Sequence, residues 1–261
     1  MKRTMTIVLA AAVALSMTAC SALDAILQVN ILKGLAALKA DDIAEADTDT
    51  LLQMSESTSF YDALADDPAV KAEVLDTIDA GIVGAPDTAE EQELAVLAAD
   101  ILLRTTAAAE LVNKVADIAA SLMTDGAIAD FEVLIDTIVP DSLYADDGSV
   151  DQAAFTEMID ALLAADAYYQ ELGSTIGAGG DYVDGADVSA GDVAQSALIA
   201  AVIKEVSLSL PGAYTDTGTY LYDLLTVPMT PEPTVDFDMP LMTPGSGYLG
   251  NLLAAAGLSF S

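Results

Sequence analysis

Apolar residues recur at steps of three and four along most of this 261-residue chain, and this spacing constrains the fold more than any other feature. Such spacing places apolar side chains on one face of an α-helix, whereas a half-buried strand requires strict alternation. The sequence therefore predicts an all-α fold, an irregular multi-helix bundle or helical array of about seven to nine helices. The longest run keeps one face apolar for about 30 residues, through Leu94, Leu97, Ile101, Ala108, Leu111, Val115, Ile118 and Leu122.

Short local signals predict where several helices begin and end. Asp67 followed by Pro68 is typical of a helix start, because the acid caps the first turn and proline fits the first helical position. Thr88 and Glu91 have the spacing of a capping box. The pair Thr105-Thr106 is a point where the long helix can kink or divide. The expected helices cover residues 23–38, 50–65, 68–81, 88–122, 192–210 and 217–225, and two more are expected shortly after Asp125-Gly126 and Asp147-Gly148.

Glycine and proline punctuate the second half of the chain. The glycines from 173 to 191 predict a loop. Five prolines between 228 and 244 predict an extended stretch, because proline cannot continue a helix. A short apolar segment, 248–258, follows it. We therefore expect three parts: a leader at 1–19, an acidic all-helical domain at 20–226, and a proline-rich extended tail at 227–261 that ends in the apolar segment.

The first 20 residues have the layout of an export signal. Lys2 and Arg3 precede an apolar stretch at 4–15 that is too short to span a bilayer, which takes about 20 residues. Met17-Thr18-Ala19-Cys20 follows, and Cys20 is the only cysteine of the chain. This segment resembles the lipobox of bacterial lipoprotein precursors, in which a hydrophobic residue and two small residues precede the cysteine that is acylated.

The lipobox resemblance implies export, cleavage before Cys20 and lipid attachment to Cys20. Several acyl chains on one residue would hold the protein firmly on a membrane. The residue after the cysteine is Ser21 rather than aspartate, which in this family favours the outer membrane over the inner one. An ordinary secretory signal cut near Ala19 is the alternative interpretation of the same residues.

The charge of the chain restricts the partners it can have. Without residues 1–19, six basic residues stand against 42 acidic ones, a net charge of −36. Nucleic acid binding needs lysine and arginine at phosphates, so we expect no nucleic acid partner. Anionic lipid headgroups would also repel the acidic domain, so we do not expect the domain itself to bind them. Cations, basic partners and high salt are compatible with such a surface.

The residue types present leave little room for catalysis. Histidine is absent, so mechanisms that need an imidazole base are excluded. Ser207 and Lys204 share a helix face at i,i+3, and paired carboxylates could in principle serve a glycosidase. A solvated lysine and chance pairs among 42 acids explain these features equally well. We therefore expect a protein that is not an enzyme and that carries no catalytic residues.

One loop suggests calcium. Residues 144–151 match the middle of an EF-hand loop, with Asp147 at its fifth position and Asp151 at its ninth. The first, third and twelfth ligand positions lack oxygen side chains. A turn made by Asp147-Gly148, followed by an acid that caps the next helix, is the alternative explanation. Asp147 and Asp151 are therefore candidate calcium ligands, and no other cofactor is expected. A further acidic cluster has the same two interpretations and comprises Asp181, Asp184, Asp187 and Asp192.

These features together predict a lipid-anchored cell-envelope protein that binds or scaffolds an envelope partner without catalysis; an accessory subunit of a transport system is one form of this role. The alternative is a calcium-stabilised or salt-adapted structural envelope protein without a dedicated partner. Tyrosine is enriched at protein interfaces, so Tyr168-Tyr169 and Tyr220 with Tyr222 are candidate recognition residues. The same tyrosines could instead fill the rim of a helical core.

Overall fold

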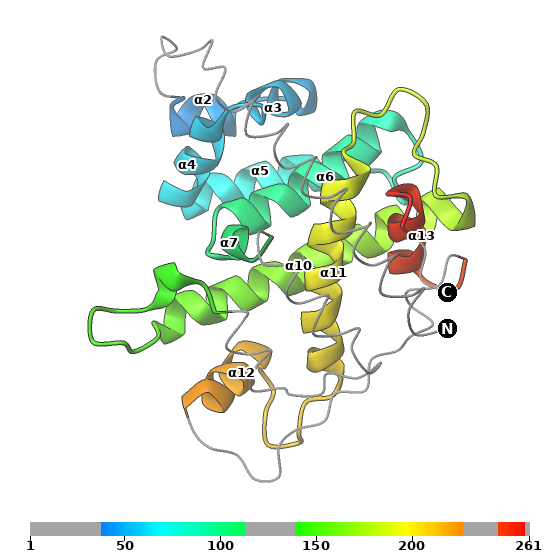
Figure 1. Ribbon diagram of the computed structural model, residues 1–261. Coiled ribbons are helices and arrows are strands. Elements are labelled where there is room, and N and C mark those ends of the chain that lie inside the picture. The colour runs from blue at the N-terminus through cyan, green and yellow to red at the C-terminus, as the bar shows by residue number, and fades with distance from the viewer. Residues whose placement is uncertain (1–37, 113–138, 227–244, 259–261) are drawn as a thin grey trace. The chain divides into compact units, whose positions relative to one another are not determined.

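The computed structural model describes residues 38–112, 139–226 and 245–258 (Figure 1). Within these ranges the chain forms ten α-helices, two short 3-10 helices and no β-strand. The extended backbone pairs at one isolated antiparallel bridge, between Tyr144 and Val150. The prediction of an all-α multi-helix fold is therefore confirmed. The expected helix at 23–38 and Cys20 lie outside the described residues.

Four helices open the described part of the chain. They are α2 (Ala40–Ala44), α3 (Thr48–Met54), α4 (Thr58–Asp66) and α5 (Pro68–Gly81). The signal at the start of α5 is confirmed, because Asp67 Oδ1 accepts hydrogen bonds from the backbone N–H groups of Ala69 and Val70 at 3.1 and 3.2 Å. Pro68 occupies the first turn of that helix, where a missing N–H is harmless.

The single helix expected at 50–65 is divided into α3 and α4. Ser55 Oγ donates to the carbonyl oxygen of Leu52 at 2.7 Å, and the Ser57 N–H bonds to the Met54 carbonyl at 3.0 Å. Serine side chains compete in this way with the regular helical bonds. This break adds one helix to those that the periodicity predicts.

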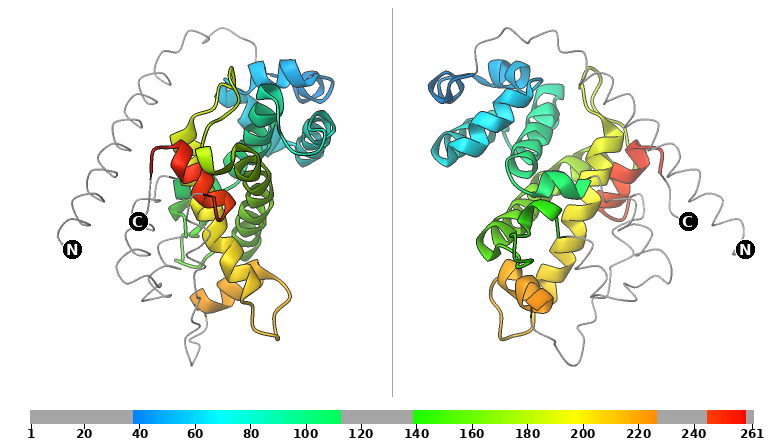
Figure 2. Two further views of the ribbon diagram at one scale, coloured as in Figure 1. Left: turned by 90° about the vertical axis from the view of Figure 1, so that its right-hand side faces the viewer. Right: turned by 60° about the vertical axis from the view of Figure 1, so that its left-hand side comes forward.

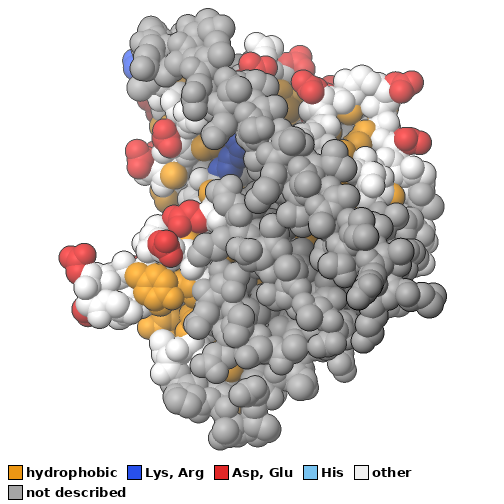
Figure 3. All heavy atoms as spheres, in the orientation of Figure 1, with side chains coloured by type: hydrophobic (Ala, Val, Ile, Leu, Met, Phe, Trp, Pro, Cys, Tyr) orange, Lys and Arg blue, Asp and Glu red, His pale blue; other side chains and the backbone are white. Residues whose placement is uncertain are grey.

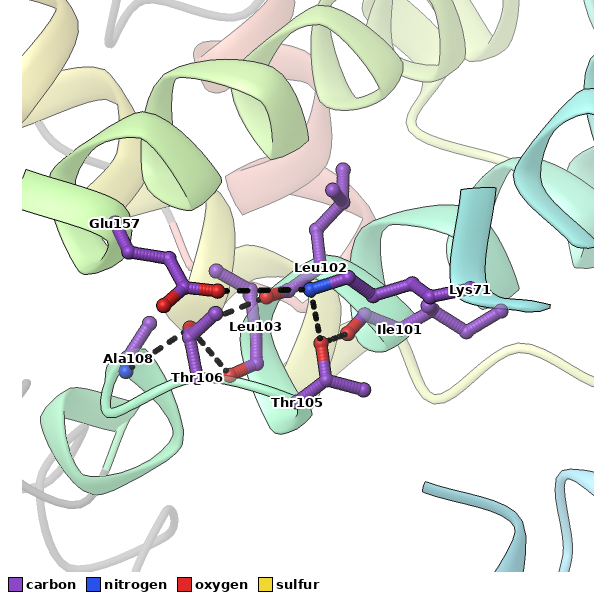
Figure 4. Close-up of polar contacts among 8 residues, drawn as sticks. All are labelled: Lys71, Ile101, Leu102, Leu103, Thr105, Thr106, Ala108 and Glu157. Carbon is purple, nitrogen blue, oxygen red and sulfur yellow. Dashed lines mark hydrogen bonds and ion pairs between the residues drawn. The ribbon is translucent and has the colours of Figure 1, made fainter. Parts of the chain in front are cut away.

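The long helix expected from residue 88 is also divided, at the predicted place. Helix α6 (Ala89–Arg104) starts at a complete capping box between Thr88 and Glu91. It ends where Thr105 Oγ1 donates to the Ile101 carbonyl at 2.7 Å. The hydroxyl of Thr106 then accepts a bond from the Ala108 N–H at 3.3 Å, at the start of α7 (Ala108–Val112) (Figure 4). The remainder of the expected helix, 113–122, lies outside the described residues.

Helix α10 (Gln152–Ile176) is the centre of the described core. It packs against α6, α11 (Ala190–Leu208), α12 (Thr217–Thr226) and α13 (Tyr248–Ala255) (Figures 1 and 2). Its buried face is an apolar stripe at helical spacing, as the sequence predicts, and is interrupted by the buried Asp166. Helix α11 is buried on most sides over 193–206, which is expected for a helix whose middle, 197–203, is entirely apolar. The largest buried side chains of α10 are Phe155, Met158, Leu162, Tyr169 and Leu172.

The glycine-rich loop is shorter than predicted. Helix α10 continues through Gly173 to Ile176, so the expectation of a loop from residue 173 is wrong for its first turn. Gly173 serves close packing instead: a Cβ atom there would lie 2.5 Å from the carbonyl oxygen of Tyr248. The loop begins at Gly177, whose φ of 61° favours glycine.

The apolar segment at the C-terminal end forms helix α13, and this helix belongs to the core. Leu249, Leu252 and Leu253 are buried against α10 and α11. The proline-rich stretch 227–244 lies outside the described residues. Of the helices that the structure describes, none combines the length and the apolar character that crossing a bilayer requires.

Candidate functional site: an acidic groove between α5 and α10

A solvent-open groove of about 490 Å³ runs between the C-terminal end of α5 and the middle of α10. Two alanines and an isoleucine supply apolar surface, and two carboxylates and a tyrosine supply polar groups. The lining residues are Asp79, Ile82, Gly84, Ala164, Ala167, Tyr168 and Glu171.

The α10 side of the groove follows from helical spacing. Positions 164, 167, 168 and 171 are three, four and seven residues apart, so they share one face of the helix. Ala164 and Ala167 are exposed, and their small side chains leave room above the helix surface. The opposite face of α10 carries the buried core residues. The same helix therefore supplies both the core and one wall of the groove.

The α5 side is shaped by the way that helix ends. The Ile82 N–H bonds to the Ile78 carbonyl at 3.1 Å and closes the helix. The next N–H group, of Val83, donates to Glu91 Oε1 at 3.2 Å, which ties the turn to the start of α6. Gly84 then adopts a φ of +89°, a conformation that favours glycine. This turn leaves the Val83 side chain 80% exposed, between two residues that line the groove.

A hydrogen bond joins the two walls. Tyr168 Oη donates to Asp79 Oδ1 at 2.6 Å. Burial raises the pKa of the Tyr168 hydroxyl, and so do its bond to Asp79 and the charges of Asp79, Glu171 and Asp76. The phenol therefore stays protonated and acts as a donor, which leaves the groove with a negative rim.

Two of the described basic side chains form contacts away from the groove. Lys71 Nζ lies 3.4 Å from Thr105 Oγ1 and 3.8 Å from Glu157 Oε1, so it joins α5, the α6–α7 turn and α10 (Figure 4). Arg104 pairs with Asp100 at 3.1 Å and lies 4.8 Å above the ring of Tyr61. None of the described lysines or arginines lines the groove.

On the face drawn in Figure 3, the acidic side chains of described residues lie at several separate places rather than in one patch. The ion pairs found among the described residues number two, Lys71 with Glu157 and Arg104 with Asp100. The exposed carboxylates in this part of the chain therefore outnumber their intramolecular partners.

The candidate calcium ligands lie in the turn before α10. Asp147 Oδ1 accepts hydrogen bonds from the Ser149 hydroxyl at 2.6 Å and the Ser149 N–H at 2.9 Å, and these bonds lower the pKa of Asp147. Asp151 Oδ1 caps α10 by accepting from the N–H groups of Ala153 and Ala154 at 2.9 and 3.1 Å. Asp147 therefore stabilises the turn and Asp151 caps the helix, as the alternative explanation expects. Calcium binding by these two carboxylates stays a prediction.

The other candidates from the sequence have local roles as well. Ser207 Oγ donates to the backbone carbonyl of Lys204 at 2.6 Å, within the helix, instead of to the lysine amine. The Asp187 N–H bonds to Glu93 Oε1 at 2.7 Å and fixes the loop before α11 against α6. Among the residues that the structure describes, no three histidine, cysteine or acidic side chains are placed to hold a metal ion together.

The tyrosines divide between the two interpretations. Tyr169 is 1% exposed and Tyr220 is 3% exposed, so both belong to the core. Tyr222 is half-buried and donates to the Val150 carbonyl at 3.3 Å. Tyr168 lines the groove. Tyr168 and Tyr222 also pack against the core, as the second interpretation expects, and a role of Tyr168 in recognition stays a prediction. Asp79 carries no local signal that separates it from the other exposed acids.

A second polar cluster, between α10 and α13, was not anticipated. Asp166 is 1% exposed and accepts hydrogen bonds from Gln170 Nε2 at 2.5 Å and from the Tyr248 hydroxyl. Burial raises the pKa of Asp166, although both hydrogen bonds and the charge of Lys204 oppose this effect. An acid inside the apolar stretch 161–169 was the signal that could have identified it. Its contacts join helices of the core, so it fixes α13 in place.

Comparison with protein-family models, with curated proteins and with solved structures finds no match.

Proposed function

We propose that this protein is a lipid-anchored, non-catalytic component of the bacterial cell envelope that binds a partner protein. The groove between α5 and α10 carries the proposal, because it combines an exposed apolar floor with unneutralised carboxylates. Concave sites of mixed apolar and polar character are typical binding sites. An accessory role in a transport system is compatible with this function.

The lipobox-like segment Met17-Thr18-Ala19-Cys20 supports the tether. It supplies the cysteine that would carry the lipid, and the residue after it, Ser21, favours the outer membrane. Each acyl-chain methylene group buried in a bilayer contributes about 0.8 kcal/mol to the free energy of membrane binding. Several chains therefore give stable attachment without a membrane-spanning helix. The strong negative charge of the chain supports a domain that stands off anionic headgroups and meets a basic partner instead.

Cross-linking in the native envelope tests the proposal. A carboxyl-directed cross-linker suits this protein, because most of the ionisable side chains of the protein are Asp and Glu. The lipidated protein is cross-linked in intact cells and recovered, and the attached proteins are identified by mass spectrometry. Incorporation of an alkyne-labelled fatty acid is measured in the same cells, with Cys20→Ala as the control.

Two results are expected from this experiment. Fatty acid label should appear on the wild-type chain and not on Cys20→Ala. One partner should be recovered reproducibly with the wild type and lost with the variant. A labelled protein that yields only background proteins would refute the binding role, and an unlabelled wild type would refute the lipid anchor.

A structural role in a saline habitat is the second candidate, and the excess of exposed carboxylates over ion pairs favours it. Salt screens repulsion between like charges, so such a protein should gain stability with sodium chloride. Thermal melts in chelator, in calcium and in sodium chloride separate the alternatives. If calcium stabilises the fold through the turn before α10, Asp147→Asn with Asp151→Asn should abolish that effect. An unchanged calcium response in this double variant would rule out a site there.

A further inference from the structure

We propose that the groove between α5 and α10 receives a lysine or arginine side chain from a basic, partly apolar segment of a partner protein. This inference rests on the proposed binding function and names the chemistry of the partner. Three features of the groove carry it: an unpaired set of carboxylates, the end of a helix, and an apolar floor.

The carboxylates around Tyr168 lack cationic partners among the described residues. Asp79 accepts one hydrogen bond through Oδ1, from Tyr168, and its other oxygen accepts none from the described chain. Asp76 and Glu171 lie close enough to Tyr168 to raise its pKa by their charge. Neither of their side chains forms an ion pair with a described residue. A positive group in the groove would therefore meet the two carboxylates that line it, those of Asp79 and Glu171.

The end of α5 adds to this negative potential. A helix C-terminus carries the equivalent of about half a negative charge on its free carbonyl groups, and basic side chains commonly neutralise it. The last turn of α5 contains no basic residue, and Asp79 lies within that turn. The free carbonyl groups at the end of α5 and the Asp79 carboxylate thus both make the electrostatic potential negative on the α5 side of the groove.

The floor matches the apolar part of the same ligand. Ala164, Ala167 and Ile82 line the groove beside the ring of Tyr168. Lysine and arginine have aliphatic stems that pack on apolar surface while their charged ends reach polar groups. Val83 is 80% exposed next to this floor, and an apolar neighbour of the cationic residue would cover it. A free cation would leave Val83 and the alanines in water, so the features together favour a peptide segment.

Defined peptides test this inference on the full chain with Cys20→Ala, which is free of lipid. The probe is a blocked amphipathic peptide of leucine, alanine and lysine. One comparison peptide replaces lysine by glutamate, and another replaces leucine by serine; spermine serves as a free polycation. Affinities are measured by calorimetry at low and at physiological salt. The Leu/Lys peptide should bind, the Glu peptide should not, and the Ser peptide and spermine should bind at least about tenfold more weakly.

Matched variants locate the binding. Asp79→Asn with Glu171→Gln should weaken the Leu/Lys peptide by about tenfold or more, because charge-assisted hydrogen bonds are lost. The control pair Asp146→Asn with Glu56→Gln removes the same charges from exposed positions elsewhere and should change affinity by less than about twofold. Ala167→Lys places a cation in the groove and should block the peptide, whereas Ala72→Lys, exposed on the N-terminal half of α5, should not.

Several results would overturn the proposal. Equal losses of peptide affinity in the groove double variant and in the control double variant would mean that the peptide is held by general charge attraction. Equal binding of spermine or of the Ser peptide would mean a cation site without a protein segment. A reproducible envelope partner whose cross-links map away from α5 and α10 would leave the proposed function standing and refute this groove. Peptide binding with these controls, but without an envelope partner, would support the groove and refute the wider function.

Discussion

Gly173 of α10 and Tyr248 of α13 meet at backbone distance: a Cβ atom on Gly173 would lie 2.5 Å from the Tyr248 carbonyl oxygen and 3.0 Å from its Cα atom. The carbonyl of Gly173 also accepts a hydrogen bond from Asn251 Nδ2 at 2.8 Å in a buried position. Glycine here lets two helices approach more closely than any side chain permits. The close contact and the hydrogen bond at Gly173 thus fix the position of α13 along α10.

Gly173→Ala should destabilise the protein, although alanine is the better helix former. The added methyl overlaps backbone atoms of α13, and overpacking of this kind typically costs about 1–3 kcal/mol. Urea unfolding followed by circular dichroism measures the change. Gly191→Ala is the matched control, because a Cβ atom there meets nothing within 4 Å and α11 should gain up to about 1 kcal/mol. Similar effects at the two glycines would contradict the close contact.

The stability of the fold should depend on pH through Asp166. Its pKa is raised mainly by burial, so the folded state binds a proton that the unfolded state has already released. The stabilising contribution of the protonated acid is complete below the unfolded value of about 3.8 and is lost as pH rises through the folded pKa. Urea midpoints from pH 3.5 upwards should fall less steeply in Asp166→Asn than in the wild type, because asparagine cannot ionise. Parallel curves would show that Asp166 does not contribute.

Asp151→Ala should lower the free energy of unfolding by about 1 kcal/mol, because α10 loses its N-cap. The exposed Asp146 in the same turn provides the control: Asp146→Ala removes an equal charge without removing a described contact. Chemical denaturation of both variants in chelator, with calcium absent, isolates the cap. An equal loss in Asp146→Ala would point to charge rather than capping.

The contact between Lys71 and Glu157 should contribute little on its own. The Lys71 side chain is 17% exposed, but Glu157 is 62% exposed and the two charged atoms are 3.8 Å apart. A double-mutant cycle with Lys71→Met and Glu157→Gln should give a coupling of less than about 1 kcal/mol that declines with added salt. A coupling above about 2 kcal/mol, insensitive to salt, would mean that the junction is effectively buried.

The helices of this protein were predictable because their signals are local. The spacing of apolar residues and the starts at Asp67-Pro68 and Thr88–Glu91 depend on neighbours within one or two turns. The sequence predicts a loop at Gly173 because a glycine in a flexible turn and a glycine that lets a neighbouring helix approach look identical in a sequence.

The groove could be predicted only in part. Tyr168 and Tyr169 are adjacent in sequence, but a helix turns about 100° per residue, so one lines the groove and the other is buried. The partner of Tyr168, Asp79, lies 89 residues away. Nothing local links those two positions, because their contact depends on how α5 and α10 each pack against α6.

The pairing of Asp166 with Tyr248 sets an order of events during synthesis. Tyr248 follows Asp166 by 82 residues, and at about 5–20 residues per second the ribosome needs roughly 4–16 s to make that interval. Until then α10 carries an acid that its final helical partner cannot yet satisfy, and burying it would be unfavourable. Closing the core between α10 and α13 therefore has to wait until Tyr248 has been made.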